Sequence, residues 1–241
     1  MGSKNMVGKV AVLAGCMALV AGLAFSSGGG GGVSPDEALQ KLMDGNKRYV
    51  ENKMTGAERC NASSREALAA TQKPYAVVLT CSDSRVPPEI IFDKGLGEIF
   101  VIRVAGNVPD PVVIGSIEYS VEHLGSPLVM VLGHERCGAI KATVDSKGKS
   151  TGSPNIDAIV KLVEPSAKAA VSTCAACKGE KSCADTKKSE FVECVVETNA
   201  VAVAGQLTQR SKILKHMADE KKIKIVAAKY DLDDGIVTLL K

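Results

Sequence analysis

The sequence predicts an α/β protein with a mainly parallel β-sheet flanked by helices and an N-terminal helical extension. Several apolar runs of about five residues lack alternation with polar residues, which is typical of strands covered on both faces. Between these runs lie longer segments whose apolar residues recur at helical spacing, so strands and helices alternate along the chain. With 241 residues, 45% of them hydrophobic, the chain can bury one large core.

The first 26 residues are typical of an export signal. Lys4 and Lys9 precede an uncharged apolar run over 10–25, which two serines and five glycines follow. The run is shorter than the ~20 residues that a transmembrane helix needs, which favours cleavage. Alternatively, Leu-Ala-Gly-Cys ending at Cys16 resembles a lipobox, which would leave a lipid on Cys16 and tether the protein to a membrane. Either reading predicts an exported protein, periplasmic or extracellular.

Two helices are predicted at the start of the folded part, after a glycine-rich tether over 27–33. Ser34 is a typical N-cap, because proline and two acidic residues follow it, and the helix is expected to continue to about Lys53. A second short helix is expected over 63–71. Residues 34–241 are predicted to form a single α/β domain.

The remaining elements alternate as an α/β fold requires. A helix over 111–124 separates two strands and so predicts a β-α-β unit. Further helical segments are expected around 155–171 and 190–220. The buried strands are predicted at 75–80, 98–103, 128–132 and 223–230, and an edge hairpin closes the chain at 236–240.

Composition excludes several classes of ligand. Lys and Arg number 30 against 27 Asp and Glu, so the chain lacks the strongly positive charge of nucleic-acid-binding proteins. It has no Trp, four Tyr and four Phe, too few aromatic residues for a base-stacking or sugar-binding surface. A small ligand is therefore expected, and no nucleic-acid partner.

Two polar clusters directly follow predicted strands. They are residues 81–85, Cys-Ser-Asp-Ser-Arg, and residues 133–138, Gly-His-Glu-Arg-Cys-Gly. Since ligands bind at the carboxyl ends of parallel strands, both clusters are expected at one edge of the sheet. Cys81, His134 and Cys137 would then form a Cys2His set around tetrahedral zinc with one position open for water. A lone Cys or His-x-x-Cys pair is usually structural, so the pairing of both clusters is what indicates a metal site.

Four blocks of the sequence resemble those of β-class carbonic anhydrases. Their order and spacing agree with that family, and the likeness extends over about 34–240. The resemblance implies one zinc ion per subunit and hydration of carbon dioxide to bicarbonate. The blocks are residues 81–86, 103–107 (Arg-Val-Ala-Gly-Asn), 116–119 (Ser-Ile-Glu-Tyr) and 133–138.

The same resemblance implies a role for individual residues. Cys81, His134 and Cys137 would bind zinc, and Asp83 and Arg85 would form a catalytic pair. Carbon dioxide or bicarbonate would be the small-molecule partner, and a homodimer or homotetramer is implied, with neighbouring subunits completing the pocket. The residues implied around the substrate are Gln72, Val86, Gly106, Tyr119 and Gly138.

The residue types account for the chemistry. Two thiolates cancel the charge of Zn²⁺, so water is acidified less than at a site with neutral ligands. Asp83, held as a carboxylate by Arg85, can accept a hydrogen bond from the attacking hydroxide and orient it toward carbon dioxide. Two alternatives remain open: hydrolysis of another linear substrate such as COS or CS2, and a non-catalytic zinc-binding module or bicarbonate sensor.

An insertion over 173–189 departs from the family pattern and holds three cysteines. In an oxidising compartment one or two disulfides are expected, joining Cys174 or Cys177 to Cys183 or Cys194. One cysteine would be left over, because Cys60 brings the number outside the zinc set to five. A second metal site or a redox role for the Cys-x-x-Cys pair is the alternative.

Overall fold

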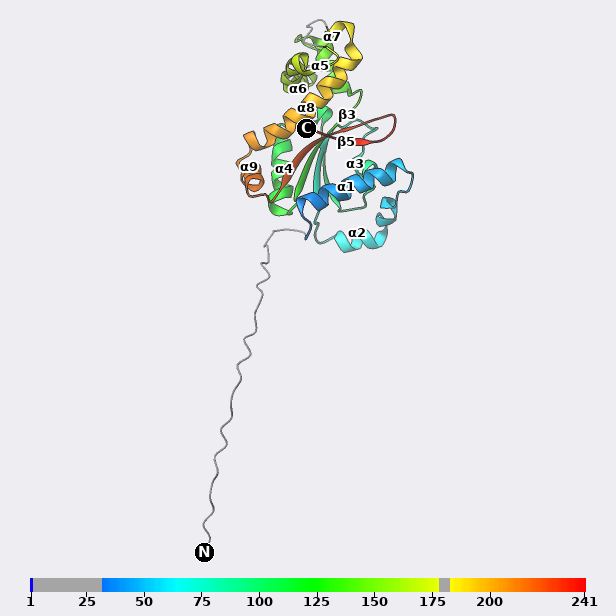
Figure 1. The fold of residues 1–241 in the computed structure, drawn as a ribbon, viewed down its shortest axis with the longest axis vertical. Coiled ribbons are helices and arrows are strands. Elements are labelled where there is room, and N and C mark those ends of the chain that lie inside the picture. Colours follow the sequence, from blue (N-terminus) through cyan, green and yellow to red (C-terminus); the bar gives the residue numbers. More distant parts are fainter. Residues whose placement is uncertain (2–31, 178–182) are drawn as a thin grey trace.

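The computed structural model describes Met1 and residues 32–177 and 183–241 (Figure 1). The export signal and lipobox predicted for 1–26, and most of the tether at 27–33, lie outside the described residues. Within the described part, no helix is both long and apolar enough to cross a membrane.

The sheet is mainly parallel, as the sequence predicts. In the described residues it has five strands in the order β2-β1-β3-β4-β5, and every neighbouring pair is parallel except β4 and β5. β1 lies between β2 and β3 in the sheet, so the connection from β2 to β3, which contains the helix over 111–123, crosses over β1. The strands are β1 (Ala76–Thr80), β2 (Ile99–Arg103), β3 (Leu128–His134), β4 (Lys224–Tyr230) and β5 (Val237–Leu240).

Helices cover both faces of this sheet (Figure 1). Alternate residues of β1 and β3 face opposite ways: Val78 and Met130 pack with α1 and α3, while Val77 and Val129 pack with α4, α8 and α9. The helices are α1 (Pro35–Val50), α2 (Ala62–Leu68), α3 (Pro88–Ile91), α4 (Pro111–His123), α5 (Gly138–Ser146), α6 (Pro154–Thr173), α7 (Cys183–Thr186), α8 (Lys188–Arg210) and α9 (Lys212–Asp219), with short 3-10 turns η1 (Gly56–Arg59) and η2 (Ala105–Asn107).

Local sequence explains where the helices begin and end. Ser34 caps α1 through a capping box with Glu37, as predicted, and α1 ends at Val50. The helical run expected over 190–220 is divided at Ser211, whose side chain accepts a hydrogen bond from the Leu214 amide and so starts α9.

Two strands are less buried than predicted. β2 was expected to be covered on both faces, but its first four residues are half-buried and Arg103 is exposed. The reason is its place at the edge of the sheet, where it has only β1 as a neighbour. β4 was also expected to be buried, yet Lys224 is exposed, and only Ala227, Ala228 and Tyr230 are fully buried.

Two disulfides join the end of α6, α7 and the start of α8. Cys174 pairs with Cys194, and Cys177 pairs with Cys183. The prediction of one or two disulfides with one cysteine left over is confirmed, because Cys60 is free. The Cys174–Cys194 bridge ties the insertion over 173–189 to α8, whereas the Cys177–Cys183 bridge closes a loop within the insertion.

Candidate metal centre

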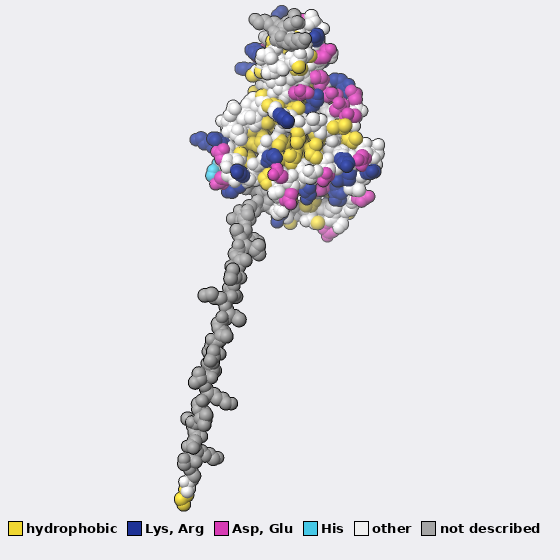
Figure 2. Space-filling view, in the orientation of Figure 1, with side chains coloured by type: hydrophobic (Ala, Val, Ile, Leu, Met, Phe, Trp, Pro, Cys, Tyr) yellow, Lys and Arg dark blue, Asp and Glu magenta, His cyan; other side chains and the backbone are white. Residues whose placement is uncertain are grey.

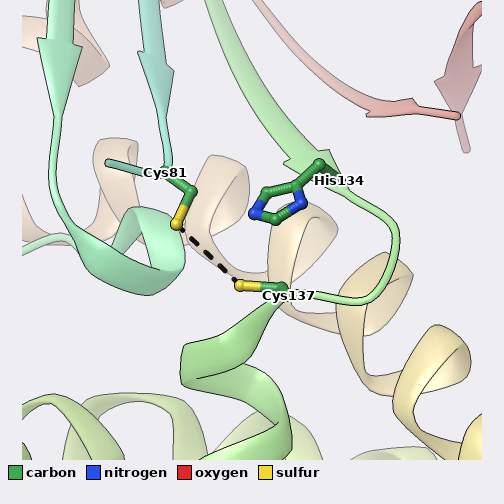
Figure 3. Close-up of side chains that lie close together, drawn as sticks. All are labelled: Cys81, His134 and Cys137. Carbon is green, nitrogen blue, oxygen red and sulfur yellow. Dashed lines mark hydrogen bonds between the residues drawn. The ribbon is translucent and has the colours of Figure 1, made fainter. Parts of the chain in front are cut away.

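Three elements bring the predicted metal ligands together (Figure 3). Cys81 directly follows β1, His134 is the last residue of β3, and Cys137 is the N-cap of α5. The two sulfur atoms lie 4.0 Å apart, and one ligand atom from each residue lies within 4.8 Å of the others. All three side chains are buried, with His134 completely so. The two polar clusters therefore meet at one edge of the sheet, as the strand pattern predicts.

The arrangement fits a zinc ion. Tetrahedral zinc with Zn–S bonds of about 2.3 Å places two sulfurs about 3.8 Å apart, close to the separation found here. Nδ1 of His134 donates a hydrogen bond to the Glu135 carbonyl oxygen at 2.8 Å, while Nε2 is buried and has no hydrogen-bond partner among the described residues. A buried imidazole whose outer nitrogen is fixed in this way offers its other nitrogen as a ligand.

A hydrogen bond links the two cysteines. The Cys137 thiol donates to Cys81 Sγ, and this hydrogen bond lowers the pKa of Cys81 to about 4 although burial opposes the change. The same contact, together with burial, raises the pKa of Cys137. Because zinc binds cysteine as the thiolate, a proton held by Cys137 would be released when the metal binds.

Asp83 and Arg85 form a bidentate ion pair beside the cluster. Arg85 donates from Nε to Oδ1 at 2.9 Å and from Nη2 to Oδ2 at 2.8 Å. These hydrogen bonds hold the pKa of Asp83 well below its usual range. Oδ2 of Asp83 lies 4.0 Å from Nε2 of His134, so the carboxylate stands next to the metal ligands. The pair is arranged as the sequence predicts for a carboxylate kept ionised at the site.

Arg103, at the end of β2, supports the Cys81 loop. Its Nε donates to the Cys81 carbonyl oxygen at 3.1 Å, and its Nη2 donates to the Asp83 carbonyl oxygen at 2.5 Å. This link holds one ligand and the acidic residue in a fixed relation. The sequence marked Arg103 only as part of a family block, so its contacts are a finding of the structure.

Gly106 approaches Cys81 from η2. Its amide donates to Sγ of Cys81 at 3.4 Å, and its φ of +72° is a conformation that favours glycine. Asn199 on α8, 1% exposed, donates from Nδ2 to the Gly106 carbonyl oxygen at 3.1 Å and accepts from the Ser166 hydroxyl. The sequence analysis missed Asn199, although a lone amide on an apolar helix face is a signal that could have found it.

A family model described as carbonic anhydrase matches residues 76–237. Carbonic anhydrase 2 of Mycobacterium tuberculosis is 37% identical over 208 residues, which cover 86% of this chain and 93% of that protein.

The chain belongs to the β-carbonic anhydrase family.

Other relatives agree with this assignment. The carbonic anhydrase of Mycolicibacterium smegmatis is 49% identical over 117 residues, covering 47% of this chain and 54% of that protein. The fold matches a Coccomyxa β-carbonic anhydrase solved with acetazolamide, at a TM-score of 0.64 and 23% identity over 84% of this chain and 86% of that one. A tetrameric β-carbonic anhydrase of Sordaria macrospora gives a TM-score of 0.63 at 22% identity, covering 84% of this chain and 96% of that one.

Of the residues predicted around the substrate, some lie beside the metal ligands of this β-carbonic anhydrase and others lie on its surface. Val86 is fully buried in the same apolar cluster as Cys81, and Gly138 begins α5 directly after the Cys137 ligand. Gln72 is exposed in the segment before β1. Tyr119, half-exposed on α4, packs its ring against those of two neighbours, Phe100 and His123. Within the described part of one subunit, no hydrogen bond or ring contact links Gln72 or Tyr119 to the metal ligands, and their substrate role stays a prediction.

Proposed function

We propose that this protein catalyses the reversible hydration of carbon dioxide to bicarbonate and a proton at the site formed by Cys81, His134 and Cys137. The observation that carries the proposal is the buried Cys2His cluster with a free His134 Nε2 next to an ionised carboxylate. The family itself supports the reaction and its zinc ion.

The protein side chains divide the chemistry between them. Bound zinc supplies a Lewis acid that activates water at neutral pH. Arg85 keeps Asp83 ionised, and the carboxylate accepts a hydrogen bond from the nucleophile, which directs the nucleophile's lone pair toward carbon dioxide. Val86 and Gly106 give an apolar boundary beside Cys81, which suits a small, linear and uncharged substrate.

Zinc stoichiometry and stopped-flow hydration of carbon dioxide test this proposal together. The wild-type protein should hold one zinc ion per chain and hydrate carbon dioxide, and Cys81→Ser should lose both. Cys60→Ser removes a free cysteine outside the cluster and should change neither. A zinc-loaded wild-type protein that is inactive throughout the pH range in which it stays folded would refute the proposal, as would faster hydrolysis of COS or CS2 than hydration of carbon dioxide.

We infer that the protein works outside the cytoplasm, in the periplasm or beyond it. Two disulfides among the described residues support an oxidising compartment. The charged, then apolar, then glycine-rich start of the sequence supports export, by a cleaved signal or by a lipid on Cys16. Mass spectrometry of the mature N-terminus distinguishes these two forms, and a chain that retains Met1 in the cytoplasm would contradict both.

We also propose that subunits pair as a homodimer or homotetramer. The exposed surface of Gln72 and Tyr119 supports this, because a second copy of the chain could contact it. The Sordaria relative, described as tetrameric, supports it as well.

A further inference from the structure

The loop between two of the metal ligands has an unusual backbone. Arg136 lies between His134 and Cys137 and has a φ of +50°, in the left-handed region. A residue with a side chain stays in this conformation only where its surroundings hold it there. This conformation decides where the chain leaves β3 and where α5 begins, and therefore how His134 and Cys137 converge.

A carboxylate on α8 holds this loop by its backbone. Oε1 of Glu193 accepts a hydrogen bond from the Arg136 amide at 2.8 Å. The Arg136 guanidinium is held separately by Asp233, through two hydrogen bonds of 3.0 and 2.8 Å. In addition, the amide of Glu135 donates to the Tyr230 carbonyl oxygen at 3.1 Å. Glu193 is thus the described residue that fixes the amide of the left-handed position itself.

Covalent and apolar anchors fix Glu193 in turn. The next residue, Cys194, is bonded to Cys174 at the end of α6. Val192 and Val195, on either side of this pair, are buried in the core. The second carboxylate oxygen of Glu193 is buried without a hydrogen-bond partner among the described residues, so the hydrogen bond that the structure gives this carboxylate is the one from the Arg136 amide.

We propose that Glu193 is a positioning residue for the metal-binding loop, and that the Cys174–Cys194 disulfide fixes its place. The inference rests on the proposed zinc site and adds a determinant outside the ligand set. Among the described residues, no hydrogen bond or ion pair links Glu193 to a ligand side chain. It acts by holding the Arg136 amide, which keeps His134 and Cys137 at the separation that zinc requires.

The first test compares zinc release from three variants on the same helix. Glu193→Ala removes the acceptor, Glu193→Gln keeps an oxygen at the same reach, and Glu197→Ala removes a glutamate one turn away that pairs with Lys229. A chromophoric chelator measures the rate at which zinc leaves the folded protein. Zinc should leave Glu193→Ala about tenfold faster than the wild type, because groups that orient metal ligands change affinity by about 10–100-fold. The other two variants should stay within about twofold.

Cobalt gives a second readout that a general loss of stability would not move. The visible and thiolate-charge-transfer bands of Co²⁺ in the folded protein report its coordination geometry. These bands should shift in Glu193→Ala and return to the wild-type positions in Glu193→Gln. Should Glu193→Ala fail to fold, Glu193→Asp, which withdraws the carboxylate by one methylene group, becomes the variant measured.

The disulfide is tested by removing each bridge separately. Cys174→Ser with Cys194→Ser should speed zinc release, and adding Glu193→Ala should then change the rate by less than it does in the wild type. Cys177→Ser with Cys183→Ser is the matched control, since neither cysteine of this bridge is adjacent to Glu193 in the chain, and it should leave the zinc release rate within about twofold.

The outcomes separate this inference from the proposed function. Unchanged zinc release and cobalt spectra in Glu193→Ala, or an equal effect of Glu197→Ala, would overturn the positioning role while leaving the zinc site intact. Equal effects of the two disulfide removals, or full additivity with Glu193→Ala, would overturn the role of Cys174–Cys194. A wild-type chain that binds no zinc would instead refute the site itself.

Discussion

Asp83 and Arg85 lie at the boundary between the buried cluster and solvent. The Asp83 side chain is 18% exposed, whereas that of Arg85 is 51% exposed. A guanidinium that remains largely hydrated loses little solvation energy, yet its two parallel hydrogen bonds still fix the carboxylate in one orientation. The half-exposed Arg85 therefore allows the Asp83 carboxylate to remain ionised beside the two sulfur ligands, because its charge is paired.

Replacing the acid tests its role without removing its volume. Asp83→Asn should lower kcat for carbon dioxide hydration by about 10²–10⁴-fold, because the neutral amide is a much weaker acceptor for the nucleophile's proton. Zinc content and the far-ultraviolet circular dichroism should stay unchanged. Stopped-flow assays measure the rate, and Asp219→Asn on the exposed face of α9 is the control. Wild-type kcat in Asp83→Asn would show that the carboxylate is not part of the chemistry.

Sequence predicted the site at the residue scale better than it predicted what supports the site. Cys81, His134 and Cys137 could be found because each lies at or just beyond the carboxyl end of a strand, and parallel strands bring these ends together. Glu193 could not be found in this way. Its role depends on a contact with a residue 57 positions away, and neither position carries a pattern that links them.

At the scale of elements, one buried acid ties α1 and the start of η1 to the segment that follows α3. Asp93, which follows α3, has no exposed side-chain surface. It accepts hydrogen bonds from Nε of Arg48 on α1 at 2.5 Å, from the Thr55 amide at 2.8 Å and from the Gly56 amide at 2.5 Å. Two segments, α1 and the start of η1, therefore depend on one carboxylate, which the sequence alone did not single out.

This acid gives a pH dependence of stability. Burial opposes ionisation of Asp93, but the donors around it outweigh burial and leave its pKa below the usual value. Such a group stabilises the fold above its unfolded pKa of about 3.9, and the contribution disappears as the pH falls through the lower folded pKa. Asp93→Asn should therefore cost about 2 kcal/mol of unfolding free energy at pH 7, and the difference from the wild type should shrink below about pH 4.

Urea denaturation at several pH values measures this difference. Circular dichroism is the appropriate signal because the chain has no Trp. Asp219→Asn, with an exposed side chain, should show no such difference at any pH. If the difference in unfolding free energy between Asp93→Asn and the wild type stayed constant into the acid range, the ionised Asp93 carboxylate would not be its cause.

A glycine sets how closely α1 approaches α3. A Cβ added at Gly45 would lie 1.9 Å from the Phe92 carbonyl oxygen, so the two helices would have to separate. Gly45→Ala should therefore lower the unfolding free energy by about 2–3 kcal/mol, the range for overpacked cores. A Cβ added at Gly205 on α8 meets no atom within 4 Å, so Gly205→Ala should raise the unfolding free energy by about 0.5–1 kcal/mol. Thermal or urea unfolding measures both, and a neutral Gly45→Ala would show that α1 can shift freely.

The positions of the helices and strands along the chain were largely predictable from the sequence, but the order of the strands in the sheet was not. Capping residues and apolar runs located α1, α4, β1 and β3 to within a few residues. The sheet order was not available from these patterns, because it depends on which strand each helix crosses. For this reason the apolar run at 98–103 predicts a strand covered on both faces, whereas the place of β2 at the edge leaves it half-buried.

At the scale of the whole molecule, apolar side chains are exposed near both edges of the sheet. Near β2, the exposed fractions are 77% for Val112 and 50% for Tyr119, both on α4. Near β5, a shallow cavity of about 280 Å³ is lined by Leu39, Val201, Leu239 and neighbouring residues. Figure 2 shows hydrophobic side chains gathered on the face that carries α8 and β5. Exposed apolar patches beside open strand edges are typical of surfaces that bind other chains.

The two patches lie at opposite edges of one sheet. Contact between copies through one edge would give a dimer, and contact through both edges would give a tetramer. The wild type should have the mass of a dimer or tetramer in light scattering after gel filtration. Val112→Glu places an acid in the first turn of α4, where the helix dipole favours it, and Leu239→Glu charges the edge strand β5. If the wild type is a tetramer, each single variant should halve its mass and the double variant should be a monomer. If the wild type is a dimer, only one of the two single variants should reduce the mass to that of a monomer. Leu162→Glu, on α6 and 37% exposed, should change nothing. A monomeric wild type, or assembly that survives both charges, would place the contacts elsewhere.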